Sequence, residues 1–441
     1  MKLNYVFFIL LTFSFFTVSC QKNLSSNSTA YSTLIYKENH ESKIKSPDKH
    51  GNLQNLLKFA LQNNPELKYY YKLYESKLSR EKYAGILPNP QISWTYYLRS
   101  VETKVGPQRH NFSVSQKVPW LNKISTKTEI AKMKSKVVLS KLNTAKHYLL
   151  SGLKTAWFDY YFLGKKIKIY EKTIKIIRQM KELSLKKYQV SPKGYEKYVL
   201  LKLQEDLLKN KIKSLQNKVK PLLYKINSYL GGKLVKFDFP QKIRLKHIKK
   251  SKKQLLAELK QNNPLLLEVE KQTDLKRSTL NLANLSSYPD FFVKLSYIET
   301  GKTDMEVKDN GKDPIMVTVG VSIPIWINEN KAEREAVQTE ISALQFKLKN
   351  TELKQKSILI KAFEGYKDAI RNMKFIEEKL LPSAKLGIKT SLNSYATGKN
   401  TVLGFLDFIK TYLKLRLSLE KEKTKAAKYV AIIEKLTGKE Q

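Results

Sequence analysis

The sequence repeats itself, and this duplication limits the possible folds more than any other feature. The segment LLKFALQNNPEL (Leu56–Leu67) has a counterpart in LLAELKQNNPLL (Leu255–Leu266). Further motif pairs follow in the same order: LPNPQISWTYY with SSYPDFFVKLSY, QKVPWLNK with VSIPIWINEN, KKYQVSPKG with NSYATGKNT, and INSYLGG with IEKLTGK. Such a repeat predicts two copies of one supersecondary unit that bury their apolar faces together.

The motif pairs also set the expected domain organisation. We expect a first repeat at residues 52–232 and a second at 254–438, joined by a basic linker at 233–253. Each repeat is predicted to contain a helix, a pair of strands, a very long helix and another helix. The fold class is therefore mostly α with a small β part.

Apolar and polar residues alternate where each repeat is predicted to form its strands. Ile92 and Trp94, for example, fall on one face and Ser93 on the other. Segments of about ten residues with this period are typical of transmembrane barrel strands, although hairpins packed on the helices of a soluble domain have the same pattern. The expected strands are about 91–101, 110–118, 290–299 and 314–323.

Four strands are too few to enclose a channel, because the diameter of a barrel grows with its strand number. Lipid also tolerates no open sheet edge. If these strands cross a membrane, they need partners from other subunits, and three copies of the chain would supply twelve strands.

Two long helices are predicted at about 124–188 and 329–394. Proline is absent between Pro119 and Pro192 and again between Pro324 and Pro382, and apolar residues recur in alternating steps of four and three. This spacing is typical of a coiled-coil seam. The first helix would be about 100 Å long, which is too long to lie on one compact core. Two independent antiparallel coiled coils would give the same pattern.

The N-terminal residues 1–19 have the features of a signal peptide: Lys2, then a mostly apolar run at 5–16, then small residues. The following TVSC motif resembles the lipobox of bacterial lipoproteins. We therefore expect Cys20 to carry a covalent lipid, with no other cofactor, and residues 20–51 to form a lipid-anchored linker. An ordinary cleaved signal with a free cysteine is the alternative. The single cysteine excludes an internal disulfide.

The hydrophobic content of 41% is ordinary for a folded protein, but the net charge of +43 is unusually high. Such an excess of Lys and Arg could attract nucleic acid or anionic lipid. The lysines are spread along the whole chain, however, and export would separate the protein from cytosolic nucleic acid. We expect most of them to lie on solvated helix surfaces and expect no nucleic-acid partner.

No pattern of catalytic residues stands out in the sequence. The five histidines are far apart and lack the spacing of zinc ligands, and no glycine-rich phosphate loop or nucleophile elbow is present. We expect neither an enzyme nor a metal site.

The motifs together resemble those of TolC-type outer-membrane efflux factors, in the lipoprotein branch of that family. The resemblance spans about Asn52–Gly438 and rests on the paired NNPEL and NNPLL, LPNP and YPDF, and QKVPW and VSIPIW motifs, with SYATGKNTVLGFLDF and YLKLRLSL. It implies a homotrimer with a twelve-stranded barrel in the outer membrane, continued by an α-helical barrel in the periplasm. It further implies a passive conduit that contacts a periplasmic adaptor and an inner-membrane pump.

The resemblance also assigns roles to particular residues. The connections at 103–108 and 301–313 would face the cell exterior. Asp407 matches an acid that narrows the channel aperture in relatives, and an exposed helix face is its alternative role. The helix turns expected to contact the adaptor contain Ser191, Pro192, Gly194, Gly398 and Lys399.

Two other functions fit parts of the sequence. A lipid-anchored periplasmic coiled-coil protein with a structural or adhesive role would use the same helices but leave the strands outside lipid. A nucleic-acid binder would use the net charge, and its binding would depend steeply on salt.

Overall fold

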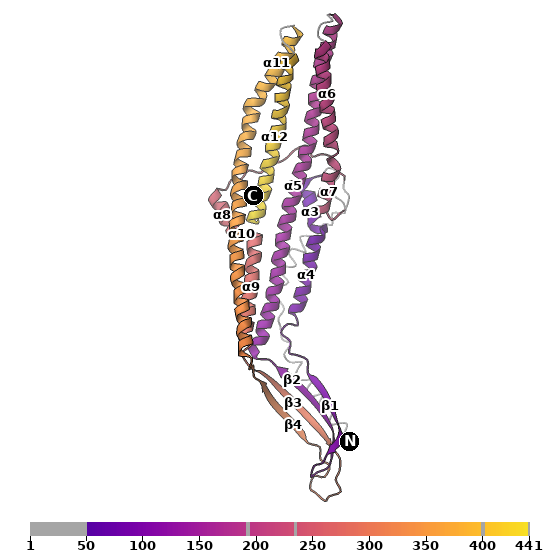
Figure 1. Ribbon diagram of the computed structural model, residues 1–441, viewed down its shortest axis with the longest axis vertical. Coiled ribbons are helices and arrows are strands. Elements are labelled where there is room, and N and C mark those ends of the chain that lie inside the picture. Colours follow the sequence, from indigo (N-terminus) through magenta and orange to yellow (C-terminus); the bar gives the residue numbers. More distant parts are fainter. Residues whose placement is uncertain (1–50, 191–194, 233–235, 398–401, 440–441) are drawn as a thin grey trace. The chain divides into compact units, whose positions relative to one another are not determined.

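Each repeat folds into a set of helices and one pair of strands, and the strands extend from one end of the helices (Figure 1). The computed structural model describes residues 51–190, 195–232, 236–397 and 402–439. The first repeat contains α3 (Leu53–Asn63), α4 (Pro65–Glu81), β1 (Gln91–Val101), β2 (Gln108–Val118), α5 (Leu121–Val190), α6 (Tyr195–Gln216) and α7 (Val219–Tyr229). Within the described ranges, no helix is both long and apolar enough to cross a membrane.

The second repeat follows the same order. It contains α8 (Lys252–Asn262), α9 (Pro264–Leu285), β3 (Asp290–Thr300), β4 (Ile315–Ser322), α10 (Ile327–Phe375), the π-helical turn η1 (Ile376–Leu380), α11 (Leu381–Ala396) and α12 (Val402–Thr437). The linker expected at 233–253 is described from residue 236 onward. Residues 236–250 contain no helix or strand, and α8 already begins at Lys252.

The helix expected at about 329–394 corresponds to one helical run over residues 327–396, which is not a regular α-helix throughout. It is interrupted by η1, and Pro382 lies at the start of α11. Proline has no backbone N–H and clashes with the carbonyl four residues before it. A π-turn locally widens the helix, and this accommodates a proline inside an otherwise continuous run. The matching helix of the first repeat, α5, is continuous over 70 residues.

The duplicated NNP motifs form the same contact in both repeats. The side-chain oxygen of Asn64 caps α4, and that of Asn263 caps α9. Each Asn also donates through Nδ2 to a carbonyl oxygen where the last helix of its repeat ends, at Tyr229 (3.1 Å) and Leu436 (2.8 Å). The motif therefore joins the beginning of each repeat to its end.

Two glycines lie against these asparagine segments. Gly231 and Gly438 both have positive φ. A Cβ at Gly231 would lie 2.6 Å from the Asn63 carbonyl oxygen, and one at Gly438 would lie 2.4 Å from that of Asn262. Both conformation and space therefore require glycine at these positions, which explains why the repeats share a glycine near their C-terminal ends.

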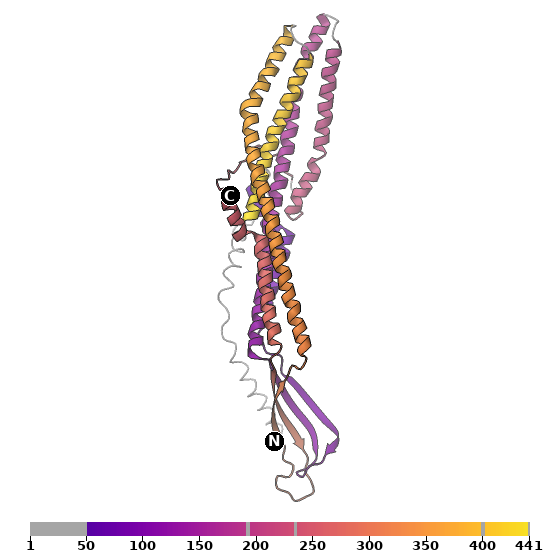
Figure 2. The ribbon, with the colours of Figure 1, turned by 60° about the vertical axis from the view of Figure 1, so that its left-hand side comes forward.

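The helices of the two repeats pack side by side rather than as separate bundles (Figure 2). Near the sheet the order of neighbours is α4, α5, α9 and α10. Toward the other end it is α6, α5, α12 and α11. In the second group one apolar core takes residues from all four helices: Ile174, Ile177, Met180, Leu201, Leu208, Tyr395, Val402, Phe405, Leu406 and Ile409.

Candidate functional site: a two-faced sheet and the helix tips

The four strands form one antiparallel sheet in the order β1-β2-β3-β4, so β2 of the first repeat pairs with β3 of the second. Within the described part of the chain, neither β1 nor β4 has a strand partner on its outer edge. The N–H and C=O groups of those edges are therefore available for pairing with another chain.

The strand register brings the apolar residues of all four strands onto one face. Trp94 lies opposite Phe112, Val114 opposite Leu295, and Leu295 opposite Val317. The members of this apolar face are Ile92, Trp94, Tyr96, Phe112, Val114, Val118, Phe291, Val293, Leu295, Tyr297, Ile315, Val317, Val319 and Val321; His110, Gln116 and Glu299 are its polar members.

The apolar face is open to the surroundings. Ile92 is 75% exposed and Val319 is 71% exposed. Single exposed apolar residues are normal, but a contiguous patch over four strands indicates a lipid or protein contact. The opposite face is mostly polar, with Ser93 and Ser113 hydrogen-bonded at 2.7 Å. One face is therefore suited to lipid and the other to water.

Both ends of the sheet are closed by specific contacts. Where the strands meet the helices, Lys123 at the start of α5 donates to Asp290 (2.8 Å) and to the Tyr288 carbonyl (2.7 Å), while Trp120 stacks on Tyr288 at a ring distance of 5.3 Å. At the other end the two connections bond to each other, because Gly301 N–H donates to the Pro107 carbonyl at 2.7 Å. The two hairpins are thereby held as one unit.

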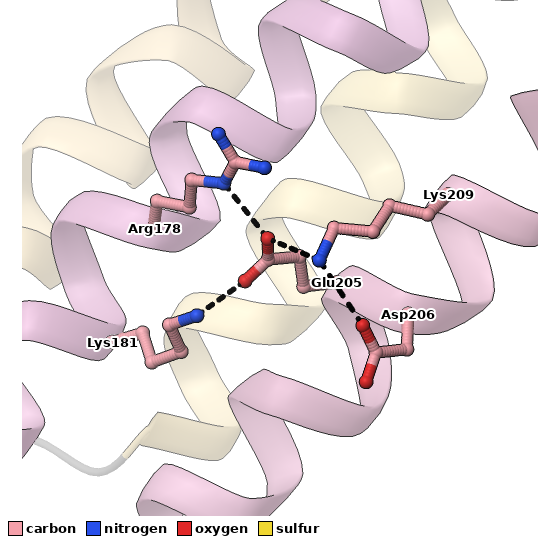
Figure 3. Close-up of polar contacts among 5 residues, drawn as sticks. All are labelled: Arg178, Lys181, Glu205, Asp206 and Lys209. Atoms are coloured by element: carbon pink, nitrogen blue, oxygen red, sulfur yellow. Dashed lines mark hydrogen bonds and ion pairs between the residues drawn. The ribbon is translucent and has the colours of Figure 1, made fainter.

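Glu205 lies at the centre of a charged cluster that joins α5 to α6 (Figure 3). Its carboxylate accepts from Arg178 (2.8 Å) and Lys181 of α5 and forms an ion pair with Lys209 of α6 (2.9 Å). The side chain is only 3% exposed. Burial alone would raise the pKa of Glu205, but the hydrogen bonds from Lys181, Lys209 and Arg178 outweigh it and lower the pKa to about 2.

A second polar contact joins the tip of α11 to α5. The hydroxyl of Tyr395 donates to Ser184 Oγ at 3.1 Å. Lys187 donates to the Tyr395 carbonyl and lies 4.6 Å from the centre of the Tyr395 ring. This contact links the first repeat to the second close to their helix turns.

Of the residues predicted for the tips, only Asp407 lies within the described chain. It is exposed on α12, between Leu406 and Phe408, and faces away from the core that buries Phe405. Cys20, Ser191, Pro192, Gly194, Gly398 and Lys399 lie outside the described residues. Sequence reasoning missed Glu205 and the role of Tyr395. Tyr395 stands in a quoted motif, whereas nothing in the local sequence marks Glu205 as buried.

The fold is similar to several solved structures. The outer-membrane channel OprN matches with a TM-score of 0.73 and 11% identity over 96% of this chain and 95% of that one. The fold is that of TolC-type outer-membrane channels. VceC of Vibrio cholerae matches with a TM-score of 0.72 and 12% identity, covering 89% of this chain and 99% of that one. CmeC of Campylobacter jejuni matches with a TM-score of 0.70 and 12% identity, covering 95% of this chain and 90% of that one. No family model matches the sequence, and no curated protein sequence matches it.

Proposed function

We propose that this chain is the outer-membrane channel component of a tripartite efflux or secretion system. Three copies would form a passive conduit that takes substrate from an inner-membrane pump and a periplasmic adaptor to the cell exterior. The observation that carries the proposal is the sheet, which has an exposed apolar face, a polar face and two edges that have no strand partner among the described residues. Its likeness to the named channels supports the same function.

The order of elements supports closure into a ring. First-repeat elements lie at one edge at every level (β1, α4, α6) and second-repeat elements at the other (β4, α10, α11). A second copy would therefore place β4 beside β1, α10 beside α4, and α11 beside α6. Exposed apolar residues are available at these edges, including Leu203 and Leu207 on α6 and Phe346 on α10. Three copies would close twelve strands and a ring of twelve helices.

The proposed orientation gives roles to the remaining residues. Lipid on Cys20 would anchor the N-terminus to the outer membrane, and the connections at 103–108 and 301–313 would face outside. Asp407 would narrow the aperture at the far end of the helices. The adaptor would contact the turns that contain Ser191, Pro192, Gly194, Gly398 and Lys399. A conduit of this kind catalyses no reaction, because transport through it is passive and the pump supplies the energy.

A matched pair of lysine substitutions tests the insertion of the sheet. Val319→Lys puts a charge on the apolar face of β4, whereas Thr318→Lys puts the same charge on the polar face. A lysine facing lipid at the middle of a bilayer costs about 2–4 kcal/mol. We expect Val319→Lys to lose most of the trimer from outer-membrane fractions and Thr318→Lys to retain it. Equal recovery of the two variants would contradict the proposal.

A carbonate wash of membranes distinguishes the conduit from an anchored coiled-coil protein. A barrel protein should keep its protease-resistant sheet after the wash. A protein held by lipid on Cys20 alone should lose that resistance, and this outcome would favour the structural or adhesive function instead.

A further inference from the structure

One side of α12 carries a stripe of lysines. The spacing of 4, 7, 7 and 7 residues returns to the same side of an α-helix each time. The stripe extends for about 38 Å. Its members are Lys410, Lys414, Lys421, Lys428 and Lys435.

Most of this positive charge is not neutralised. Within the described ranges, Lys428 is the one member with a carboxylate partner, Asp159 of α5. Lys435 lies 4.4 Å from the centre of the Tyr148 ring, and burial lowers the pKa of this lysine. The stripe therefore has a surplus of cations and attracts anions.

A groove of about 400 Å³ lies between this stripe and α5. Its volume is in the range of sites for small molecules. It combines apolar side chains with four ammonium groups, and no carboxylate lines it. The lining residues are Phe162 and Lys166 of α5 with Lys410, Leu413, Lys414, Leu417, Ser418 and Lys421 of α12.

Lys166 extends the cationic side of the groove. Its Nζ lies 4.2 Å from the centre of the Phe162 ring. Burial, followed by the nearby Lys218 and Lys421 ammonium groups, lowers the pKa of Lys166. A ligand anion beside Lys166 and Lys421 would relieve this repulsion, while Phe162, Leu413 and Leu417 would contact an apolar chain. The chemistry fits an anionic amphiphile, such as an alkyl phosphate or sulfonate.

The groove faces away from the linker at 236–250. The linker packs on Tyr160 of α5 through Phe237 and Phe239, and near Val430 of α12. Successive residues of an α-helix are rotated by about 100°. Phe162, two residues from Tyr160, therefore lies on nearly the opposite side of α5 from the linker. Lys421, nine residues from Val430, likewise lies on the opposite side of α12. In the proposed ring of helices, we place the three linkers, which cover the opposite side of α5 and α12, on the outside. The groove then faces the lumen.

Lipid of the outer membrane is not a suitable occupant. Phe162 is 41 residues along α5 from Leu121, where the helix leaves the sheet, and this places the groove about 60 Å from the strand ends. A ligand must therefore arrive through the lumen.

We propose that this groove binds anionic amphiphiles and that the cargo of the conduit belongs to this class. The inference rests on the proposed function, because the groove faces a lumen only in the trimer.

Two measurements on the trimer in lipid nanodiscs and planar bilayers test the inference. The first is calorimetric titration with decyl phosphate below its micellar concentration, compared with decyltrimethylammonium. The second is the reversal potential in a KCl gradient. The test variant is the double substitution K414E/K421E, which changes two exposed residues of the groove. The control is K225E on α7, an exposed lysine on an element that packs against α5 outside the groove.

We expect the wild-type trimer to bind decyl phosphate in preference to the cationic amphiphile. K414E/K421E should lose the binding and lower the Cl⁻/K⁺ permeability ratio by roughly threefold or more, while K225E should behave as wild type. Equal binding of both amphiphiles, or unchanged binding and permeability ratio in K414E/K421E, would overturn the inference and leave the conduit intact. A water-soluble monomer that still binds decyl phosphate would instead overturn the conduit and keep the groove.

Discussion

The two long helical hairpins at the end far from the sheet occupy equivalent positions in the two repeats but are held together differently. In the first, α5 is continuous and Glu205 binds cations from both α5 and α6. In the second, the π-turn η1 precedes α11 and Pro382 lies in the first turn of α11. Within the described residues, the ion pair that joins this arm to α12 is a more exposed one, between Glu377 of η1 and Lys423 (3.6 Å). Gly387 of α11 also faces Phe408 where any Cβ would clash, at 2.4 Å.

The two copies of one duplicated unit have therefore diverged in the contacts that join their long helices. Buried polar contacts fix the distance between α5 and α6. The second hairpin depends on apolar packing and on the Tyr395 contact with α5. We therefore expect the second hairpin to move more readily, and the following changes test that contrast.

The largest effect should come from Phe405→Ala, because Phe405 lies in the core that all four tip helices share and is fully buried. Truncating a buried Phe costs about 3–5 kcal/mol. Amide hydrogen exchange should accelerate in both hairpins. Phe408→Ala is the control. Because Phe408 is 42% exposed, its truncation should lower the free energy of unfolding by less. Loss of protection in only one hairpin would contradict a shared core.

Glu205→Gln should loosen the first hairpin alone. The neutral side chain leaves Arg178, Lys181 and Lys209 without their shared carboxylate, and we expect a loss on the order of 2 kcal/mol. Hydrogen exchange should rise in α6 and stay unchanged in α11. Asp206→Asn is the matched control, because Asp206 is exposed and pairs only with Lys209 among the described residues. Similar exchange in the two variants would show that Glu205 has no special role.

The same carboxylate predicts a pH dependence. The pKa of Glu205 is about 2 in the folded chain, against 4.5 for the unperturbed group. A lowered pKa stabilises the folded form above the unfolded pKa, and the stabilisation is lost as the pH falls toward about 2. The difference in urea midpoint between wild type and Glu205→Gln should therefore be constant above about pH 5 and shrink below it. A difference that grows on acidification would reverse the assigned sign.

The smallest effect should come from Pro382→Ala. Alanine has a backbone N–H that can bond to a carbonyl of the preceding turn. The free energy of local unfolding of α11 should therefore rise, by less than about 1 kcal/mol. Hydrogen exchange at residues 383–386 should slow. Pro221→Ala in α7 serves as a control away from the π-turn. If exchange at these residues is unchanged, Pro382 does not explain the weaker second hairpin.

Local patterns in the sequence predict much of this fold. Strict alternation predicts the strand faces, since Ile92 and Val319 do lie on the exposed apolar side. The duplicated NNP motifs predict equivalent positions, and both asparagines make the same cap. The pairing of β2 with β3, which merges the two hairpins, depends on contacts far apart in the sequence and had no local signal.

The candidate site was less predictable for physical reasons. The π-turn before Pro382 could not be predicted, because π-turns have no characteristic amino-acid composition. The many lysines near Glu205 in the sequence suggest an exposed, solvated carboxylate. Glu205 is buried only because α5 packs on α6. Asp407 was predicted at the aperture and lies exposed on α12, and its role there depends on the neighbouring copies.

Counting the copies in the membrane-extracted particle tests the central claim most directly. Native mass spectrometry of protein extracted from outer-membrane fractions should give three chains per particle, since the described part of one chain supplies no strand to pair with the outer edges of β1 and β4. A cysteine pair placed across β1 and β4 should cross-link different copies. A folded single chain that stays in solution without detergent would contradict the account.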